Sequence, residues 1–188
     1  MTIEKTGIRD SIERMAEYGR IDSERFGLTG CGLAVVRNER GIITQEVEFE
    51  NLVTQIGDQY YGDRAAGIGS IAAITGMQLG TGSTAPAKTG AGAAIVTLVA
   101  ASLVALTGGF PASSLNGSSR RIQYQVLWGA GVATATGIAE AALVNQATGT
   151  QTVAPAANTI ARALLSPVVN KGAGDTLTVT WNNDLLGA

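Results

Sequence analysis

The chain has 188 residues, of which 45% are hydrophobic and 5% aromatic, and its formal net charge is −2. This length favours one domain, and the hydrophobic content separates the chain from the polar, highly charged sequences of disordered proteins. The negative balance argues against nucleic acid as a partner, because phosphate neutralisation needs positive charge. A single cysteine, Cys31, excludes an intrachain disulfide and a cysteine-based zinc site. We interpret Cys31, which stands between two glycines, as a small buried hydrophobic residue.

The N-terminal segment differs from the rest of the chain. Residues 1–64 hold 12 acidic and 8 basic side chains, whereas residues 65–188 hold only 3 and 5. Within residues 3–18, Ile8, Ile12 and Met15 recur at helical spacing among charged residues. This stripe predicts an amphipathic helical arm over 1–30, followed by a β-rich domain over 31–188. A lone amphipathic helix needs a partner to bury its apolar stripe, so we expect the arm to dock on a neighbouring subunit. The segment lacks the apolar core of a secretory signal, and we expect assembly in the cytoplasm.

A hairpin and a short helix are predicted next. Residues 31–37 and 42–49 flank a polar turn, and the second run alternates apolar with polar side chains, as a half-buried strand does. Asn51 is a good helix N-cap, and Leu52, Ile56 and Tyr60 recur at every fourth position. We therefore expect a helix from Asn51 to about Tyr61.

The remaining chain consists of short apolar runs separated by Gly, Ser, Asn and Pro. The runs cover residues 71–79, 93–106, 120–129, 137–145, 159–166 and 175–182. Two of them alternate, with Ile122 to Trp128 and Leu177 to Trp181 each placing apolar residues at every second position. Such spacing is typical of an antiparallel β-sandwich or a jelly-roll-like body.

The run over 93–106 is the most apolar part of the chain. It is too short for a membrane-spanning helix, which needs about 20 residues, so no membrane partner is expected. Periodicity alone does not separate a buried strand from a buried helix here, and we favour the strand.

The sequence GTGSTAPAKT at residues 80–89 approaches a phosphate-binding loop. It departs from that motif where Ala87 replaces the second glycine and where Pro86 removes an amide donor. We therefore interpret it as a loop joining two strands.

The chain contains no histidine, which removes the usual catalytic base of nucleophilic enzymes. The β-rich part offers only Glu140, Asp175 and Asp184 as carboxylates, too scattered for a glycosidase pair. Glu140 is expected to form a structural ion pair with Arg162 or Arg120. We accordingly predict no catalytic, cofactor-binding or metal-binding residues, and no cofactor.

Residues 116–124 hold a turn followed by the start of a strand. Asn116-Gly117-Ser118 predicts the turn. Arg120 and Arg121 follow it, either as strand-edge charges that discourage unwanted pairing or, together with Tyr124, as a surface contact. The predicted interface residues are therefore Arg120, Arg121 and Tyr124 together with the stripe of Ile8, Ile12 and Met15.

Several stretches between residues 45 and 182 resemble a widespread group of tailed-phage virion proteins. These stretches are NLVT at 51–54, MQLGTGSTAP at 77–86, WGAGVAT at 128–134, IAEA at 138–141, ARA at 161–163 and SPVVNKGAGDTLTVTW at 166–181. The group is described variously as capsid cement or decoration, tail and fibre components. The resemblance implies a structural subunit of the virion, assembled in the host bacterial cytoplasm.

The resemblance also implies partners. They are further copies of the chain, with a trimer as the first expectation, and either the major capsid protein or tail proteins. A capsid decoration protein that stabilises the capsid lattice is the leading interpretation. The alternative is a tail, fibre or baseplate component that recognises the host surface, with contacts on the loops near residues 107–119. A cell-wall hydrolase is a third and more distant interpretation.

Overall fold

The computed structural model describes residues 27–69, 71–146, 148 and 151–186. Within them the chain is mainly β, with one α-helix and nine strands in a single antiparallel sheet, so the predicted fold class is confirmed. The predicted arm over 1–30 falls largely outside the described residues, as do Ile8, Ile12 and Met15. The first described element, β1, begins at Gly27.

The elements follow one another along the chain with short connections. They are β1 (Gly27–Arg37), β2 (Ile43–Val53), α2 (Gln55–Ala65), β3 (Gly76–Gly80), η1 (Gly90–Ala93), β4 (Val104–Ala105), β5 (Ala112–Asn116), β6 (Ser119–Trp128), β7 (Ala135–Val144), η2 (Ala156–Asn158), β8 (Thr159–Lys171) and β9 (Thr176–Leu186). The predicted hairpin over 31–49 is confirmed as β1 and β2.

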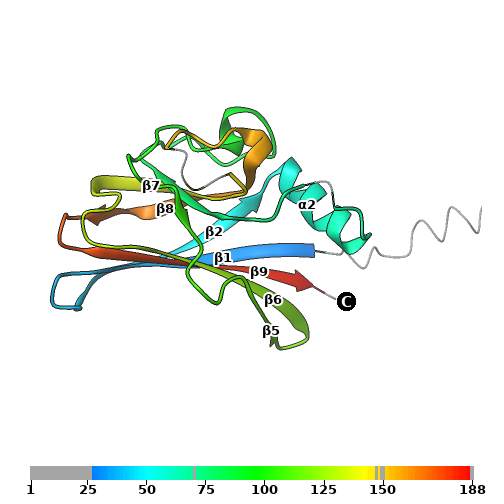
Figure 1. Cartoon of the computed structure of the whole chain (residues 1–188), viewed down its shortest axis with the longest axis horizontal. Helices are drawn as coiled ribbons and strands as arrows, with labels where there is room; N and C mark the ends of the chain where they lie inside the picture. The colour runs from blue at the N-terminus through cyan, green and yellow to red at the C-terminus, as the bar shows by residue number, and fades with distance from the viewer. Residues whose placement is uncertain (1–26, 70, 147, 149–150, 187–188) are drawn as a thin grey trace, which may run out of the picture.

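The sheet curls into two packed layers, and β2 connects them (Figure 1). The strand order is β4-β3-β7-β8-β2-β1-β9-β6-β5. β2 pairs with β1 over most of its length, and its last residues, Asn51–Val53, pair with β8 in the other layer. The two ends of the sheet also approach each other, because the Thr107 N–H donates to the Gln125 carbonyl of β6 at 2.8 Å. The body is therefore a sandwich that is almost closed.

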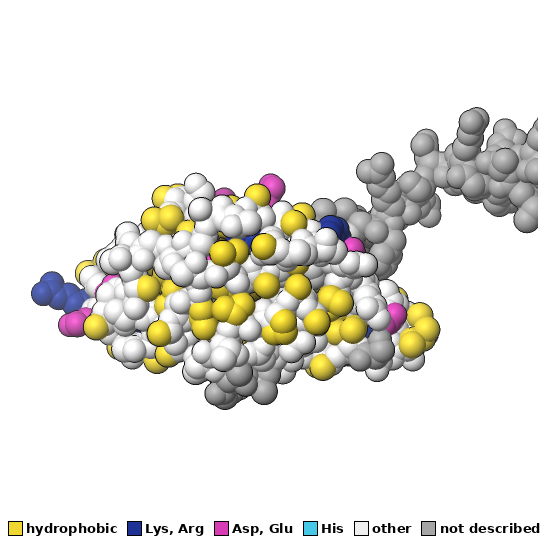
Figure 2. Space-filling model, turned by 90° about the horizontal axis from the view of Figure 1, so that it is seen from above, with side chains coloured by type: hydrophobic (Ala, Val, Ile, Leu, Met, Phe, Trp, Pro, Cys, Tyr) yellow, Lys and Arg dark blue, Asp and Glu magenta, His cyan; other side chains and the backbone are white. Residues whose placement is uncertain are grey.

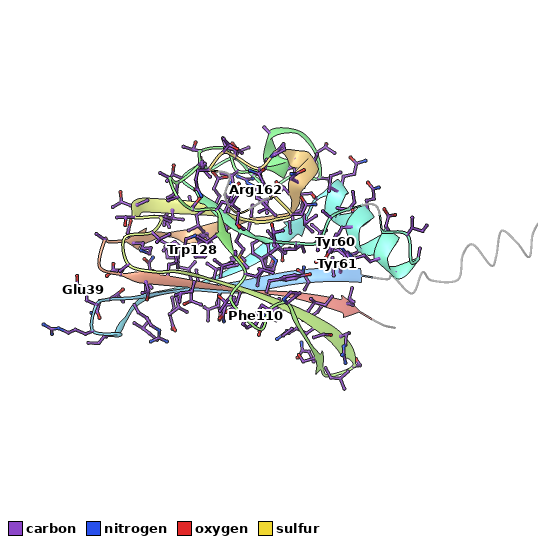
Figure 3. The ribbon with its side chains drawn as sticks, in the orientation of Figure 1. Glu39, Tyr60, Tyr61, Phe110, Trp128 and Arg162 are labelled. Atoms are coloured by element: carbon purple, nitrogen blue, oxygen red, sulfur yellow. The ribbon has the colours of Figure 1, made fainter. Side chains whose placement is uncertain are left out.

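The core lies between the two layers and confirms the predicted alternation. Trp128 of β6 and Trp181 of β9 are both fully buried, and Trp181 meets Phe49 of β2 edge to face, with ring centroids 5.2 Å apart. Figure 3 shows Trp128 between the layers. A buried aromatic ring of this kind removes about 150–250 Å² from water.

The helix begins later than the sequence predicts. Asn51 is part of β2, and Thr54 is the N-cap of α2, where its side chain accepts a hydrogen bond from the Gly57 N–H. The prediction of Asn51 as the cap is wrong because pairing with β8 extends β2 through Val53. The helix then runs to Ala65, one turn past the expected end at Tyr61.

The prediction of a strand over 93–106 is also largely wrong. Only Val104–Ala105 forms a strand, β4, with one isolated bridge between Leu98 and Gly80. Ile95, Val99 and Leu103 are buried as their hydrophobicity predicts. The backbone between them is irregular, however: the amides of Val96 and Thr97 bind the buried Glu140 side chain, and the Val99 N–H donates to the Leu79 carbonyl of β3.

Candidate interaction face

A surface of mixed polar and apolar side chains covers the outside of the layer formed by β2, β1, β9 and β6, and we call it the outer face. Its side chains alternate with core residues along each strand. The registers align them in three rows across the four strands. The rows are Glu46–Val35–Thr178–Leu127, Glu48–Leu33–Thr180–Gln125 and Glu50–Cys31–Asn182–Gln123. The outer face is thus a regular grid set by strand pairing.

One border of the outer face is acidic. Glu46, Glu48 and Glu50 stand at every second position of β2 and are all exposed, while Val47 and Phe49 between them face the core. The three rows contain no Lys or Arg side chain. Like charges in a line on one strand repel each other weakly in water, and a basic partner would relieve that repulsion.

At the other border, side-chain hydrogen bonds link β6 and β9. The Gln123 Nε2 donates to the Asn182 Oδ1 at 2.9 Å, and the Gln125 Nε2 donates to the Thr180 Oγ1 at 3.1 Å. These links between neighbouring strands fix side chains that would otherwise be mobile. These side chains are therefore already ordered in the free protein, and a partner that binds them causes a smaller loss of conformational entropy.

Cys31 lies at the surface, which corrects the prediction of a buried residue. It is exposed and lines a shallow hollow of about 500 Å³ together with Leu33, Glu48, Glu50 and Asn182. Alternation decides this placement, because Gly32 and Ala34 face the core and Cys31 therefore faces solvent.

Arg120 and Arg121 lie on opposite faces of β6, so the predicted joint surface of Arg120, Arg121 and Tyr124 does not exist. Arg121 faces outward and forms a two-pronged ion pair with Asp184 of β9, with both N···O distances at 2.8 Å. This hydrogen bonding from Arg121 lowers the pKa of Asp184. Arg120 faces the other way, where its Nε donates to the Ser113 Oγ at 2.8 Å.

Two further predictions at this strand need correction. Tyr124 is only 2% exposed, and its hydroxyl lies 3.3 Å from that of Tyr61. It is a core residue, as its place in the alternation of β6 already implied. The arginines do not guard a free edge either, because β5 pairs with β6 along Ser119–Gln123. The predicted turn at Asn116–Ser118 is confirmed, since it joins β5 to β6.

The only fully buried ion pair in the described part of the chain joins Glu140 of β7 to Arg162 of β8. The Arg162 Nη2 lies 2.5 Å from the Glu140 Oε2, and both side chains are 0% exposed. Of the two predicted partners, Arg162 is therefore the correct one. Figure 3 shows Arg162 in the layer that lies over the outer-face strands.

Glu140 also binds backbone amides of the irregular segment above it. Its Oε1 accepts hydrogen bonds from the N–H groups of Gly82, Val96 and Thr97 at 2.9 to 3.1 Å. Arg162 completes the cluster by donating from Nη1 to the Gly92 carbonyl at 3.2 Å. Gly82 belongs to the loop over residues 80–89 that approaches a phosphate-binding motif, and its amide donates to the Glu140 carboxylate instead. This arrangement joins residues 80–97 to the sheet, and no sequence pattern revealed it.

The face opposite the outer face carries few charges. Figure 2, which views the molecule from above the β7–β8 layer, shows scattered hydrophobic and mostly uncharged atoms there. Among the residues that the structure describes, no group of three or more Cys, Asp or Glu side chains is arranged to hold a metal ion. In the same residues, no helix is both long and apolar enough to cross a membrane.

Comparison with known proteins adds no relative. No family model, no curated protein and no solved structure matches the chain.

Proposed function

We propose that the chain is a structural subunit of a tailed-phage virion and that it binds the particle through the outer face. A capsid decoration protein is the form we favour. The observation that carries the proposal is the outer face itself, a grid of side chains with one acidic border and one border fixed by hydrogen bonds. The resemblance of residues 45–182 to virion proteins supports the same assignment.

Charge gives the outer face a preferred kind of partner. Three exposed glutamates in a line favour a surface that presents Lys or Arg at similar spacing. Exposed pairs contribute little each, typically about 0.2–1 kcal/mol, and salt screens them. Repetition over a symmetric lattice, or within an oligomer of this chain, multiplies such modest contacts into stable attachment.

The buried charges are consistent with a structural role. Glu140 is the only fully buried carboxylate in the described residues, and Arg162 together with backbone amides uses both of its oxygens. A carboxylate that serves as a general acid or base needs access to a substrate. Glu140 is occupied in holding a loop, which favours the non-enzymatic assignment that we propose.

The hairpin of β5 and β6 supports the second candidate function, host recognition by a tail component. Residues 112–118 are all exposed, and Leu115 is 74% exposed. The hairpin extends beyond the body in Figure 1. An exposed leucine on a projecting hairpin is suited to contact a receptor, and this candidate predicts few copies per particle.

The outer-face proposal is tested by removing the acidic border. The variant with Glu46→Gln, Glu48→Gln and Glu50→Gln keeps the shape of the face and removes three charges. We expect it to bind particles assembled without the protein at least about tenfold more weakly than the unmodified chain at low ionic strength, which corresponds to losing roughly 0.5 kcal/mol at each position.

The matched control is Glu39→Gln. Glu39 lies in the turn between β1 and β2, at the end of the molecule away from α2 (Figure 3). We expect its binding to stay within about twofold of the unmodified chain, since single exposed charges contribute little. Equal binding by the triple variant and the unmodified chain, measured by co-sedimentation, would exclude the acidic border as a docking element.

A further inference from the structure

A groove opens between α2 and the ends of β6 and β9, and we call it the α2 groove. It has a volume of about 260 Å³. Its lining consists of Tyr60, Tyr61, Arg64 and Ala65 of α2 with Ile122, Tyr124 and Leu185 of the sheet. Figure 3 shows Tyr60 and Tyr61 between the helix and the strands below it. The groove is therefore mainly aromatic and aliphatic, with Arg64 as its one charged side chain.

The floor of the α2 groove is rigid. The Tyr61 hydroxyl accepts a hydrogen bond from the Asn183 Nδ2 at 2.5 Å and lies 3.3 Å from the Tyr124 hydroxyl. Arg64 is held at one side, with its guanidinium carbon 4.4 Å from the centre of the Tyr60 ring. A preformed hollow loses less freedom on binding than one that must open.

A row of side chains leads from the groove onto the hairpin, with the charged Arg120 between two leucines. Leu185 of β9 pairs with Arg120 of β6, which pairs with Leu115 of β5, so the three residues form one row on the same side of the sheet. Leu115 is 74% exposed, the highest value among the large hydrophobic residues described as exposed. The row extends the groove past the end of the core.

The size of the groove favours side chains of a protein segment over a small molecule. Small-molecule sites usually measure about 300–1,000 Å³ and enclose most of their ligand. At about 260 Å³, with an open continuation along Leu115, the α2 groove matches the way an amphipathic helix inserts a few anchors into a hydrophobic groove.

The N-terminal segment of the chain leaves the body beside this groove. Gly27 pairs with Leu186, and Leu28 pairs with Leu185, which lines the groove. Residues 3–18 carry the apolar stripe of Ile8, Ile12 and Met15. The eight residues 19–26 can span at most about 26–29 Å when extended, which is enough to lead the segment back over the groove.

We propose that the α2 groove is the docking site for residues 3–18 of the same chain, with Ile8, Ile12 and Met15 packed against its apolar lining and Leu115. A tether of eight residues gives the segment an effective concentration of the order of millimolar, above that of free copies in a micromolar solution. The groove's position beside Gly27 therefore favours the chain's own segment over the neighbouring subunit that the sequence alone suggests. The docking needs no virion partner, so it can be tested on the purified chain.

The first test is hydrogen exchange of the full-length chain. Ile8→Asp combined with Ile12→Asp places charges on the stripe and leaves the body unchanged. We expect amides of Tyr60–Ala65 to exchange about tenfold faster than in the unmodified chain, because the cover of α2 is lost. Ile3→Asp is the matched control, since Ile3 lies about 140° around the predicted helix from Ile8 and away from the stripe. Identical exchange in the double variant and the unmodified chain would overturn the proposal.

The second test identifies which chain supplies the segment. In a Cys31→Ser background, which removes the only native cysteine, Ile12→Cys and Leu115→Cys are introduced together and oxidised at micromolar concentration. We expect a disulfide within one chain, seen as a monomer of faster mobility without reductant. The control pair of Ile3→Cys and Leu115→Cys should cross-link several-fold less. Disulfide-linked dimers from the first pair, or equal cross-linking by both pairs, would contradict docking by the chain's own segment.

Discussion

At the scale of single residues, Glu140 organises more structure than any other polar side chain that the structure describes. Its two oxygens bind Arg162 and three amides from the segment 80–97, so the carboxylate replaces the strand pairing that this segment lacks. Burying a charge is costly unless the charge is paired and hydrogen-bonded, as that of Glu140 is. This explains why a segment with little regular structure can still pack on β7 and β8.

Replacing Glu140 should therefore be costly. Glu140→Gln leaves the Arg162 guanidinium buried without a counter-charge, and we expect the free energy of unfolding to fall by about 3–5 kcal/mol. Urea denaturation at neutral pH measures this difference. Glu48→Gln, an exposed change of the same kind, should stay within about 0.5 kcal/mol of the unmodified chain. A Glu140→Gln variant as stable as Glu48→Gln would show that the buried pair is not a stabilising anchor.

Tyr61 gives a second residue-scale prediction, one that depends on pH. Burial raises the pKa of Tyr61 from 10.0 to about 12, against the opposing effect of its hydrogen bonds to Tyr124 and Asn183. Because the pKa of Tyr61 is higher in the folded than in the unfolded chain, the folded state is favoured while Tyr61 is protonated, and this contribution to the free energy of unfolding is complete below pH 10. It is then lost as the pH rises from 10 to about 12.

The loss amounts to roughly 2–3 kcal/mol for a shift of this size, and Tyr61→Phe should remove it. Unfolding free energies measured at several values between pH 9 and 12, together with tyrosinate absorbance, provide the comparison. If the free energy of unfolding of the unmodified chain falls no faster between pH 9 and 12 than that of Tyr61→Phe, the pKa of Tyr61 is not raised.

At the scale of elements, the sequence predicts the strands with strong alternation and misplaces the ends that tertiary pairing decides. β6 and β9 could be recognised because Trp128 and Trp181 end runs with apolar residues at every second position. The start of α2 could not, since Asn51 and Thr54 are both good N-caps. Only the pairing of Asn51 with Ala163 of β8 selects Thr54.

Thr54 has two roles that can be tested together. Its hydroxyl accepts from the Gly57 N–H at the start of α2 and donates toward the carbonyl of Thr159 at 2.6 Å. We expect Thr54→Ala to lower the free energy of unfolding by about 1–2 kcal/mol. Thr54→Ser keeps the hydroxyl, so its free energy of unfolding should stay close to that of the unmodified chain. Chemical denaturation of the two variants decides the matter, and equal losses in both would mean that the hydroxyl is unimportant.

The segment over 93–106 shows another limit of sequence reasoning at this scale. Its hydrophobicity predicts burial, and Ile95, Val99 and Leu103 are indeed buried. Its backbone conformation depends instead on Glu140, more than forty residues away along the chain, which binds the amides of Val96 and Thr97. A pattern read within the segment does not contain that partner.

At the scale of the whole molecule, the curled sheet separates the two surfaces that we propose to be functional. The outer face covers β2, β1, β9 and β6, whereas α2 lies at one end, beside the start of β1 (Figure 1), and the α2 groove lies between it and the ends of β6 and β9. The sequence predicts the fold class and the alternation that creates the outer face. The same alternation already separates the adjacent Arg120 and Arg121 onto opposite sides of β6. The sequence does not predict the α2 groove, because that groove depends on where α2 packs against the ends of β6 and β9.

The number of copies of this chain per virion tests the central proposal most directly. Quantitative mass spectrometry of purified particles would compare it with the major capsid protein. A decoration protein that binds the lattice through its outer face should approach one copy per capsid subunit. A few copies to a few dozen would instead favour the tail component. Absence of the chain from purified virions would contradict the proposed virion role itself.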